Sequence, residues 1–193
     1  MLLVGGPSSR FGSPKALAVL DGETLAERAW RVLVEACEER LAVGKLADGP
    51  ELPFPVQDDG TEIRAPIAGV VAGLRLATTE LCVFLPVDCP LVTPALLLKL
   101  ADDCAGDAAV PQTGPLPGAY RRSALPVLER RLDSGELSLR DALAALDAGV
   151  VEVDPALLVN VNTPDDLRLI VESPTRLRGG LSTKGPFKRE QPR

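Results

Sequence analysis

The chain has 193 residues, of which 46% are hydrophobic and 25% are charged. These proportions exclude a disordered chain, and the length is sufficient for one domain with its own core. The chain contains no histidine, which excludes Ser–His and Cys–His nucleophiles and His-ligated metal sites. Carboxylates, lysines and arginines must therefore carry any chemistry.

The net charge of −6 is unevenly distributed along the chain. Residues 173–193 carry six basic side chains and one acidic side chain, which leaves residues 1–172 with a net charge of −11. The acidic body and an aromatic content of only 3% both argue against a nucleic-acid partner. We expect one domain over residues 1–172, followed by a basic, mobile C-terminal tail over residues 173–193.

The cysteines and the absence of a long apolar run indicate the cellular compartment of the protein. The four cysteines form no Cys-x-x-Cys pair, and we expect small buried side chains in a reducing compartment. We see no signal peptide and no apolar run long enough to cross a bilayer. We therefore expect a cytoplasmic protein with no membrane partner.

The first half of the chain predicts alternating strands and helices. An apolar run at Leu2–Val4, followed at once by two glycines, is typical of a buried parallel strand. A second apolar run, Ala16–Leu20, ends at a turn signal, Asp21-Gly22, and apolar residues at helical spacing follow from 25 to 36. The pattern then predicts a short strand at 41–43, a loop at 50–55 and a helix at 67–77.

The second half continues this alternation. Its clearest buried strand is Leu81–Val87, and Thr93 and Pro94 provide an N-cap and a first-turn proline for a helix reaching about residue 104. The pattern further predicts strands at 108–110, 150–153 and 157–161, and helices at 124–132, 139–146 and 164–172. This alternation predicts an α/β fold with a mostly parallel sheet that is covered on both faces. Ligands bind such sheets beyond the carboxyl ends of the strands, where the strand order reverses.

The segment from Leu3 to Lys15 follows the first strand and combines three glycines with Arg10 and Lys15. Glycines let backbone amides approach an anion closely, and the two cations add positive charge, so this composition suits a polyphosphate. The segment is neither a Walker loop nor a GxGxxG fingerprint. A plain surface turn is the alternative, but two cations in an acidic body are hard to explain by solubility alone.

Asp88 directly follows the apolar strand and therefore lies at the carboxyl edge of the sheet. A carboxylate partly withdrawn from water at this place needs a cation, which Lys15, Arg10 or a magnesium ion could supply. The alternative is that Asp88 only caps the following turn.

Two further places are candidates, the second of them on weaker grounds. Asn160 and Asn162 alternate around one valine before the last helix, so both side chains are expected on the same face. Asp58 follows a strand-like stretch at 55–57. The asparagines are also common turn residues, and Asp58 taken alone is more typical of a loop than of a site.

Taken together, these segments resemble the molybdenum cofactor guanylyltransferases, a branch of the nucleotidyltransferases with a Rossmann-like fold. The resemblance rests on the glycine loop with Arg10 and Lys15, on Asp88 before Pro90, and on the sequence Asn-Val-Asn-Thr-Pro-Asp-Asp-Leu at 160–167. It runs from about residue 2 to residue 170 and implies a single three-layer nucleotidyltransferase domain with a mostly parallel sheet.

The resemblance also implies roles for residues on the nucleotide side. Leu3, Val4, Gly5 and Gly6 would bind the nucleotide, the first three lining the guanine and ribose through their backbone. Asp58 would contribute to the same nucleotide site. The chain departs from the family at Val4, where alanine is usual, and this position would lie near the nucleoside.

The remaining implied roles concern phosphates, metal and acceptor. Lys15 and Arg10 would bind the phosphates and act with Asp88 in catalysis, Asp88 would hold both nucleotide and Mg²⁺, and Asn160 and Asn162 would face the pterin. The implied reaction transfers GMP from GTP to molybdopterin and releases pyrophosphate. A phosphate monoester is already nucleophilic at neutral pH, so this reaction needs no histidine base.

Alternatives to this reading remain open at this point. The same chemistry could use CTP with the pterin, or a sugar phosphate as acceptor, and a different class of protein would be a non-catalytic nucleotide-binding regulatory module. We expect a monomer or a weak homo-oligomer, and the resemblance implies a link to the proteins that mature molybdoenzymes.

Overall fold

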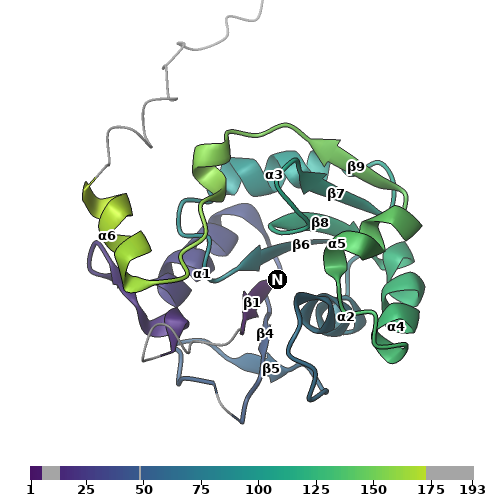
Figure 1. Ribbon diagram of the computed structural model, residues 1–193, viewed down its shortest axis with the longest axis horizontal. Helices are drawn as coiled ribbons and strands as arrows, with labels where there is room; N and C mark the ends of the chain where they lie inside the picture. The colour runs from purple at the N-terminus through teal and green to yellow at the C-terminus, as the bar shows by residue number, and fades with distance from the viewer. Residues whose placement is uncertain (6–13, 48, 173–193) are drawn as a thin grey trace, which may run out of the picture.

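The structure, a computed structural model, describes residues 1–5, 14–47 and 49–172. It contains a central sheet with helices on both faces (Figure 1). The strands of this sheet are, in chain order, β1 (Leu2–Val4), β4 (Ala42–Gly44), β5 (Val56–Asp58), β6 (Leu81–Pro86), β7 (Ala108–Pro111), β8 (Gly118–Arg121) and β9 (Ala148–Val151). The helices are α1 (Leu25–Ala36), α2 (Pro66–Leu76), α3 (Pro94–Asp102), α4 (Leu125–Asp133), α5 (Leu139–Ala142) and α6 (Pro164–Glu172).

The order of the strands defines a switch point between β1 and β6. Within the described residues the sheet order is β5-β4-β1-β6-β8-β7-β9. From β1 the chain first builds outward through β4 to β5, and then returns to place β6 on the other side of β1. β1 is parallel to both neighbours, with Leu3 paired with Val43 and with Pro86. The carboxyl ends of β1 and β6 therefore lie side by side where the strand order reverses, which is where open α/β sheets bind ligands.

The sheet is mostly parallel, as predicted, with β8 as the exception. β8 runs antiparallel to both β6 and β7. No strand was predicted at Gly118–Arg121, because the preceding run of glycines and prolines is typical of turns. The strand nevertheless forms, and the buried Tyr120 donates its hydroxyl to the Pro115 carbonyl at 2.8 Å.

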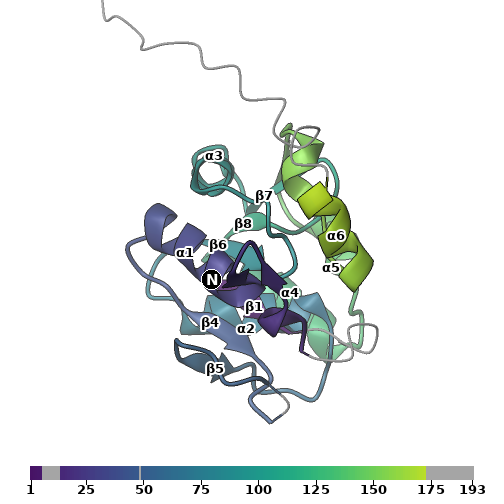
Figure 2. The same cartoon turned by 90° about the vertical axis from the view of Figure 1, so that its left-hand side faces the viewer.

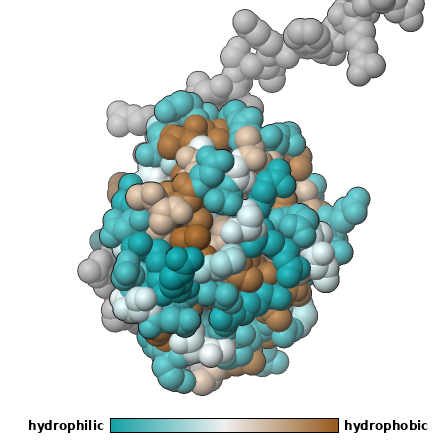
Figure 3. All heavy atoms as spheres, turned by 90° about the vertical axis from the view of Figure 1, so that its right-hand side faces the viewer, coloured by the Kyte–Doolittle hydropathy of each residue, from teal (hydrophilic) through white to brown (hydrophobic). Residues whose placement is uncertain are grey.

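Helices α1 and α3 pack on one face of the sheet, and α2 and α4 pack on the other (Figures 1 and 2). Alternate residues of β1 divide between these two cores: Val4 is buried in the first core, whereas Leu3 packs against the second. This two-period alternation is what a strand buried on both faces requires. Hydrophilic side chains cover most of the side that carries α4 and α5, with apolar side chains in smaller groups between them (Figure 3).

The chain before α1 contains a short 3-10 helix, Lys15–Leu17, followed by the hairpin of β2 (Val19–Leu20) and β3 (Glu23–Thr24). The turn of this hairpin is the predicted Asp21-Gly22 pair, with φ angles of 53° and 82° that suit a tight hairpin turn. α1 then begins with a complete capping box, in which Thr24 accepts from the Glu27 N–H and Glu27 accepts from the Thr24 N–H.

Two predicted elements were wrong in type or length. The strand expected at 157–161 is a 3-10 helix at Pro155–Leu158, because Asp154 caps it by accepting from the Ala156 N–H and a proline fills its first position. The helix expected at 139–146 ends as an α-helix at Ala142 and continues as a 3-10 turn, Leu143–Ala145.

The four cysteines are free thiols, three of them buried and Cys37 half-buried. In the part of the chain that the structure describes, no helix is both long and apolar enough to span a bilayer. The tail at 173–193, together with Gly6 and Arg10, lies outside the described residues.

Candidate functional site

Lys15 and Asp88 form an ion pair at the carboxyl edge of the sheet. The Lys15 Nζ atom lies 3.1 Å from Asp88 Oδ2, and the two side chains are 16% and 24% exposed. Lys15 comes from the 3-10 helix after the glycine loop, and Asp88 comes two residues after the end of β6. The sequence analysis named Lys15 as one of the cations that could offset the Asp88 charge, and the fold brings these two side chains into direct contact.

Asn160 and Asn162, which lie near the other end of the chain, contact residues at the same place: Asn162 contacts Lys15, and Asn160 contacts Cys89. Lys15 Nζ also donates to Asn162 Oδ1 at 3.1 Å, and the Cys89 thiol donates to Asn160 Oδ1 at 2.9 Å. Between the asparagines, Val161 is fully buried and its N–H donates to the Asp88 carbonyl at 2.8 Å. Among the described residues, this backbone hydrogen bond, rather than a strand ladder, links the segment before α6 to the chain just after β6.

Asp166 orients the asparagine segment from the first turn of α6. Its Oδ2 atom accepts the backbone N–H groups of Asn162 at 2.7 Å and of Thr163 at 2.8 Å. The Asn162 N–H is the main cause that lowers the pKa of Asp166. Asp166 therefore holds the backbone of the asparagine segment against the start of α6.

Cys89 is the site residue that the sequence analysis missed, because it counted all cysteines as core residues. Its side chain is buried, and its sulfur lies 3.7 Å from Asp88 Oδ1 in addition to its contact with Asn160. Burial, followed by the nearby Asp88 carboxylate, raises the pKa of the Cys89 thiol well above its usual value. The signal that was available is its position directly after the strand-ending aspartate.

The β1 residues lie beside this group. Leu3 pairs with Pro86, so Gly5 and Asp88 each lie two residues beyond that pair, at the same edge. Val4 is buried, whereas Gly5 is exposed, and no heavy atom of the described residues lies within 4 Å of a Cβ added to it. A ligand could therefore approach the Gly5 backbone closely.

Asp58 lies at the same edge of the sheet but two strands away from β1. It is the last residue of β5, paired with Gly44 of β4. Its carboxylate accepts the N–H groups of Leu46 at 3.0 Å and Gly60 at 2.8 Å, which lower its pKa, the Leu46 N–H most. Among the described residues no contact joins Asp58 to the Lys15–Asp88 pair.

The donor set at Asp88 fits a magnesium ion shared with a phosphate ligand. Mg²⁺ prefers oxygen ligands and is usually bound by one or two carboxylates together with substrate phosphates. In the described residues no three Cys, Asp or Glu side chains cluster to hold a metal by themselves. Asp88 Oδ1 has only the long contact from the Cys89 thiol among these residues, and so retains free lone pairs.

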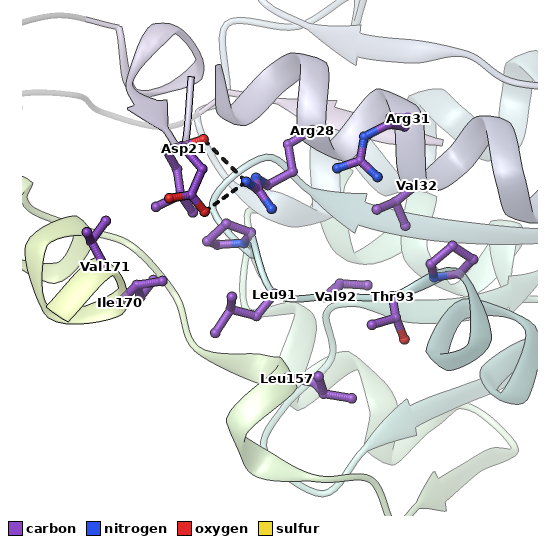
Figure 4. A pocket seen from close by; sticks show the side chains of 13 residues that line it. Asp21, Arg28, Arg31, Val32, Leu91, Val92, Thr93, Leu157, Ile170 and Val171 are labelled. Carbon is purple, nitrogen blue, oxygen red and sulfur yellow. Dashed lines mark hydrogen bonds and ion pairs between the residues drawn. The ribbon is translucent and has the colours of Figure 1, made fainter. Parts of the chain in front are cut away.

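A separate cavity of about 420 Å³ opens between α1, the 90–94 turn and α6 (Figure 4). Arg28 and Arg31 line one side, with Arg28 paired to Asp21 at 3.5 Å, and apolar side chains such as Leu91 line the other. Its lining includes none of the five residues that make up the site described above, Lys15, Asp88, Cys89, Asn160 and Asn162, so it is a different place on the molecule.

Comparisons with known proteins agree with this geometry. A family model described as the MobA-like NTP transferase domain matches residues 1–150. The probable molybdenum cofactor guanylyltransferase of Chloroflexus aggregans is 36% identical over 190 residues, covering 88% of this chain and 91% of the relative. The molybdenum cofactor guanylyltransferase of Pseudomonas putida is 35% identical over 185 residues, covering 87% and 94%.

Solved structures show the same relationship. The molybdopterin-guanine dinucleotide biosynthesis protein A of Archaeoglobus fulgidus superposes with a TM-score of 0.71 at 27% identity, covering 91% of this chain and 97% of that one. The 2-C-methyl-D-erythritol 4-phosphate cytidylyltransferase of Thermus thermophilus, with a TM-score of 0.70 at 21% identity, shows the shared fold alone. The chain therefore belongs to the family of MobA-like NTP transferases, and it is a nucleotidyltransferase.

Proposed function

We propose that the protein transfers GMP from GTP to molybdopterin, in a Mg²⁺-dependent reaction that releases pyrophosphate. The observation that carries this proposal is the contact of Lys15 with both Asp88 and Asn162 at the switch point of the sheet. One cation, one carboxylate and one amide thus lie together at the edge of the sheet where folds of this type bind ligands, which supports the proposal. The substrates come from the names of the relatives, which are called molybdenum cofactor guanylyltransferases.

The reaction makes modest demands on the protein. An oxygen of the terminal phosphate of molybdopterin forms a bond to the α-phosphorus of GTP, while the bond from that phosphorus to the bridging oxygen of the β-phosphate breaks. Pyrophosphate leaves with the electron pair of that bond. The attacking phosphate is already anionic, so no side chain has to remove a proton, which agrees with a chain that contains no histidine. Positioning and charge neutralisation are the main contributions left to the protein.

Lys15 supplies the positive charge in this scheme. Its ammonium group binds the triphosphate and offsets charge that moves onto the departing pyrophosphate. We assign Arg10 the same role from its place in the glycine loop, and we assign Leu3, Val4, Gly5, Gly6 and Asp58 to nucleotide binding. Asn160 and Asn162 face the acceptor.

Asp88 would hold the magnesium ion. When bound, the ion supplies Lewis-acid polarisation of the phosphates and neutralises part of their charge. Without the ion, the Asp88 carboxylate offsets most of the charge of Lys15, which weakens the attraction of Lys15 for the triphosphate. We therefore expect activity to depend on Mg²⁺. As a separate part of the proposal, we expect the reaction to take place in the cytoplasm.

The direct test is to identify the product. Purified protein is incubated with Mg²⁺, molybdopterin and either GTP or CTP, and the products are identified by mass spectrometry while pyrophosphate release is followed. We expect a guanine dinucleotide of molybdopterin and equimolar pyrophosphate with GTP, and much less product with CTP. A cytosine dinucleotide as the main product would correct the base, whereas Mg²⁺-dependent GTP binding without any product would support a regulatory module instead.

A further inference from the structure

The wall of the site contains a hydrogen bond between a buried thiol and an exposed amide. Cys89 is only 3% exposed, and its Sγ atom donates to Asn160 Oδ1 at 2.9 Å. The two residues are 71 positions apart in the sequence, so the fold creates this contact. Asn160 itself is exposed at the edge of the sheet.

This hydrogen bond determines which end of the Asn160 amide faces a ligand. An asparagine side chain has one carbonyl that accepts hydrogen bonds and one NH₂ group that donates two. Because the carbonyl is turned toward the thiol, the NH₂ group is left for other partners. Within the described residues no hydrogen bond occupies Asn160 Nδ2. Asn162 shows the same arrangement, since its Oδ1 atom accepts from Lys15. The two amides therefore present donors, rather than acceptors, to a molecule beside the ion pair.

We propose that Cys89 is a positioning residue, whose thiol holds the Asn160 amide so that its NH₂ group faces an acceptor substrate rich in oxygen atoms, such as a phosphate monoester. This inference rests on the proposed function, because it assigns Asn160 to the acceptor side of that reaction. It gives Cys89 a specific role, which follows from the contact between Cys89 and Asn160.

The physical reason is the near-symmetry of the amide. Without a donor beneath it, the amide can turn by about half a rotation, because this terminal torsion is broad and roughly two-fold. The carbonyl would then face the phosphate, and two acceptors would repel one another. The backbone of the segment is held separately, through the Val161 N–H and the Asp88 carbonyl at 2.8 Å. Loss of the thiol should therefore disturb the amide while leaving the segment in place.

The first test compares Cys89→Ala with Cys89→Ser in steady-state kinetics. We expect Cys89→Ala to raise the KM for the acceptor about 3- to 10-fold, the range expected when one hydrogen bond of ordinary strength is lost. The KM for GTP should change little. Cys89→Ser keeps a hydroxyl donor and should recover most of the loss. A control is Cys104→Ala at the end of α3, where the thiol is equally buried but donates to the Gly106 and Ala119 carbonyls.

A double-mutant cycle shows whether Cys89 acts through Asn160. Asn160→Ala removes the amide, and Cys89→Ala added to that variant should then have no further effect on the acceptor KM. An undiminished effect in the Asn160→Ala background would overturn the proposal, as would equal rises in the KM for GTP and for the acceptor. An effect of the same size from Cys104→Ala would show that a buried cavity, rather than positioning, causes the loss.

A spectroscopic measurement separates this proposal from the proposed function. The S–H stretching band of Cys89 can be identified in the infrared spectrum as the band that Cys89→Ala removes. If the thiol donates to Asn160, this band shifts in Asn160→Ala, and an unshifted band overturns the contact and the proposal with it. A wild-type protein that makes no dinucleotide overturns the proposed function and the acceptor role, even where the band shift is observed.

Discussion

At the residue scale, Lys15 links three parts of the chain that are far apart in sequence. It lies 73 positions from Asp88 and 147 positions from Asn162, yet it contacts both at 3.1 Å. A partly buried ion pair contributes little net stability, because desolvation offsets most of the attraction. Function is therefore the better explanation for placing this pair at the switch point. The contact holds the ammonium group at the edge of the sheet before a ligand arrives.

Lys15→Ala tests the role of this cation. We expect kcat/KM for GTP to fall by about 2–4 kcal/mol of transition-state stabilisation, which corresponds to roughly 30- to 900-fold. The physical reason is that alanine removes the positive charge that Lys15 would place against the triphosphate. The measurement is initial-rate pyrophosphate release at several GTP concentrations.

The control for this variant is Lys99→Ala, which removes an exposed lysine paired with Asp103 at 2.7 Å on α3. It should leave kcat/KM near the wild-type value, because the pair lies on the surface and is worth about 0–1 kcal/mol of stability. If Lys15→Ala were as active as Lys99→Ala, Lys15 would have no part in binding or transfer.

At the element scale, the elements with strong local signals could be predicted and those set by distant partners could not. α1 and α3 have N-caps and apolar stripes, and β6 is a continuous apolar run, so each was predicted within a few residues. β8 was missed because its pairing with β6 and β7 overrides a turn-like sequence. The false strand at 157–161 is apolar, but it finds no neighbouring strand in the described residues.

The residues of the candidate site also divide into those with a local sequence signal and those whose contacts depend on distant parts of the chain. Asp88 and Lys15 could be found because they follow a strand and a glycine loop, where ligands bind in such folds. That Lys15 also meets Asn162 depends on the path of the chain between β9 and α6, which crosses past the carboxyl end of β6 (Figure 1). Cys89 was missed because a buried cysteine in a site has the same residue type and apolar surroundings as one in a core, and only its position directly after Asp88 distinguishes it.

The pairing of β1 with β4 depends on a glycine. A Cβ added at Gly44 would lie 2.0 Å from the Val4 carbonyl oxygen, far inside van der Waals contact. Gly44→Ala should therefore push the two strands apart and destabilise the fold by about 1–3 kcal/mol, the usual cost of overpacking. Thermal unfolding measures this as a decrease in Tm of roughly 2–12 °C for a domain of this size.

Gly149→Ala is the matched control in β9, because its nearest heavy atom, the Ala108 carbonyl oxygen, lies 3.9 Å from the added Cβ. We expect its Tm to stay close to that of the wild type. Equal Tm values for the two variants would show that the β1–β4 pair adjusts without cost, contrary to the distances.

The start of α6 should give stability a pH dependence. Hydrogen bonds, first that of the Asn162 N–H, lower the pKa of Asp166 in the folded protein below its ordinary value of 3.8. The carboxylate therefore stabilises the fold above the unfolded pKa, and this stabilisation is lost as the pH falls through the lower folded pKa. We expect Asp166→Asn to have a lower Tm than the wild type at pH 6, and the difference to shrink as the pH falls below about 4.

The control for the pH series is Asp165→Asn in the same turn. Asp165 pairs with Arg168 at 2.9 Å, but both side chains are more than 70% exposed. Its removal should change Tm by a small amount at pH 6, because exposed pairs are weak. A constant difference between wild type and Asp166→Asn at every pH would mean that charge at Asp166 does not stabilise this segment.

At the scale of the whole molecule, an acidic protein has to bind an anionic nucleotide. The chain has a net charge of −6, so long-range attraction does not favour GTP. At the site, Asp88 also offsets the charge of Lys15. A magnesium ion on Asp88 would change this local balance, since it supplies two positive charges and competes with Lys15 for the carboxylate. Binding of the triphosphate should accordingly be coupled to the metal.

This coupling predicts that removal of Mg²⁺ weakens GTP binding to the wild type but has little effect on GTP binding to Asp88→Ala. For the wild type, GTP with Mg²⁺ at about one hundred times its Kd should raise Tm by roughly 5–11 °C, and EDTA should remove most of this shift. In Asp88→Ala, Lys15 no longer faces the Asp88 carboxylate, so GTP in EDTA should raise Tm more than in the wild type, and Mg²⁺ should add little.

The control is Asp103→Ala, which removes the exposed partner of Lys99 and should behave as the wild type does. Thermal shift measurements on the three proteins, with GTP and with Mg²⁺ or EDTA, provide the comparison. A wild-type shift that is the same in Mg²⁺ and in EDTA would contradict a metal held by Asp88, because the nucleotide would then bind to the protein without it.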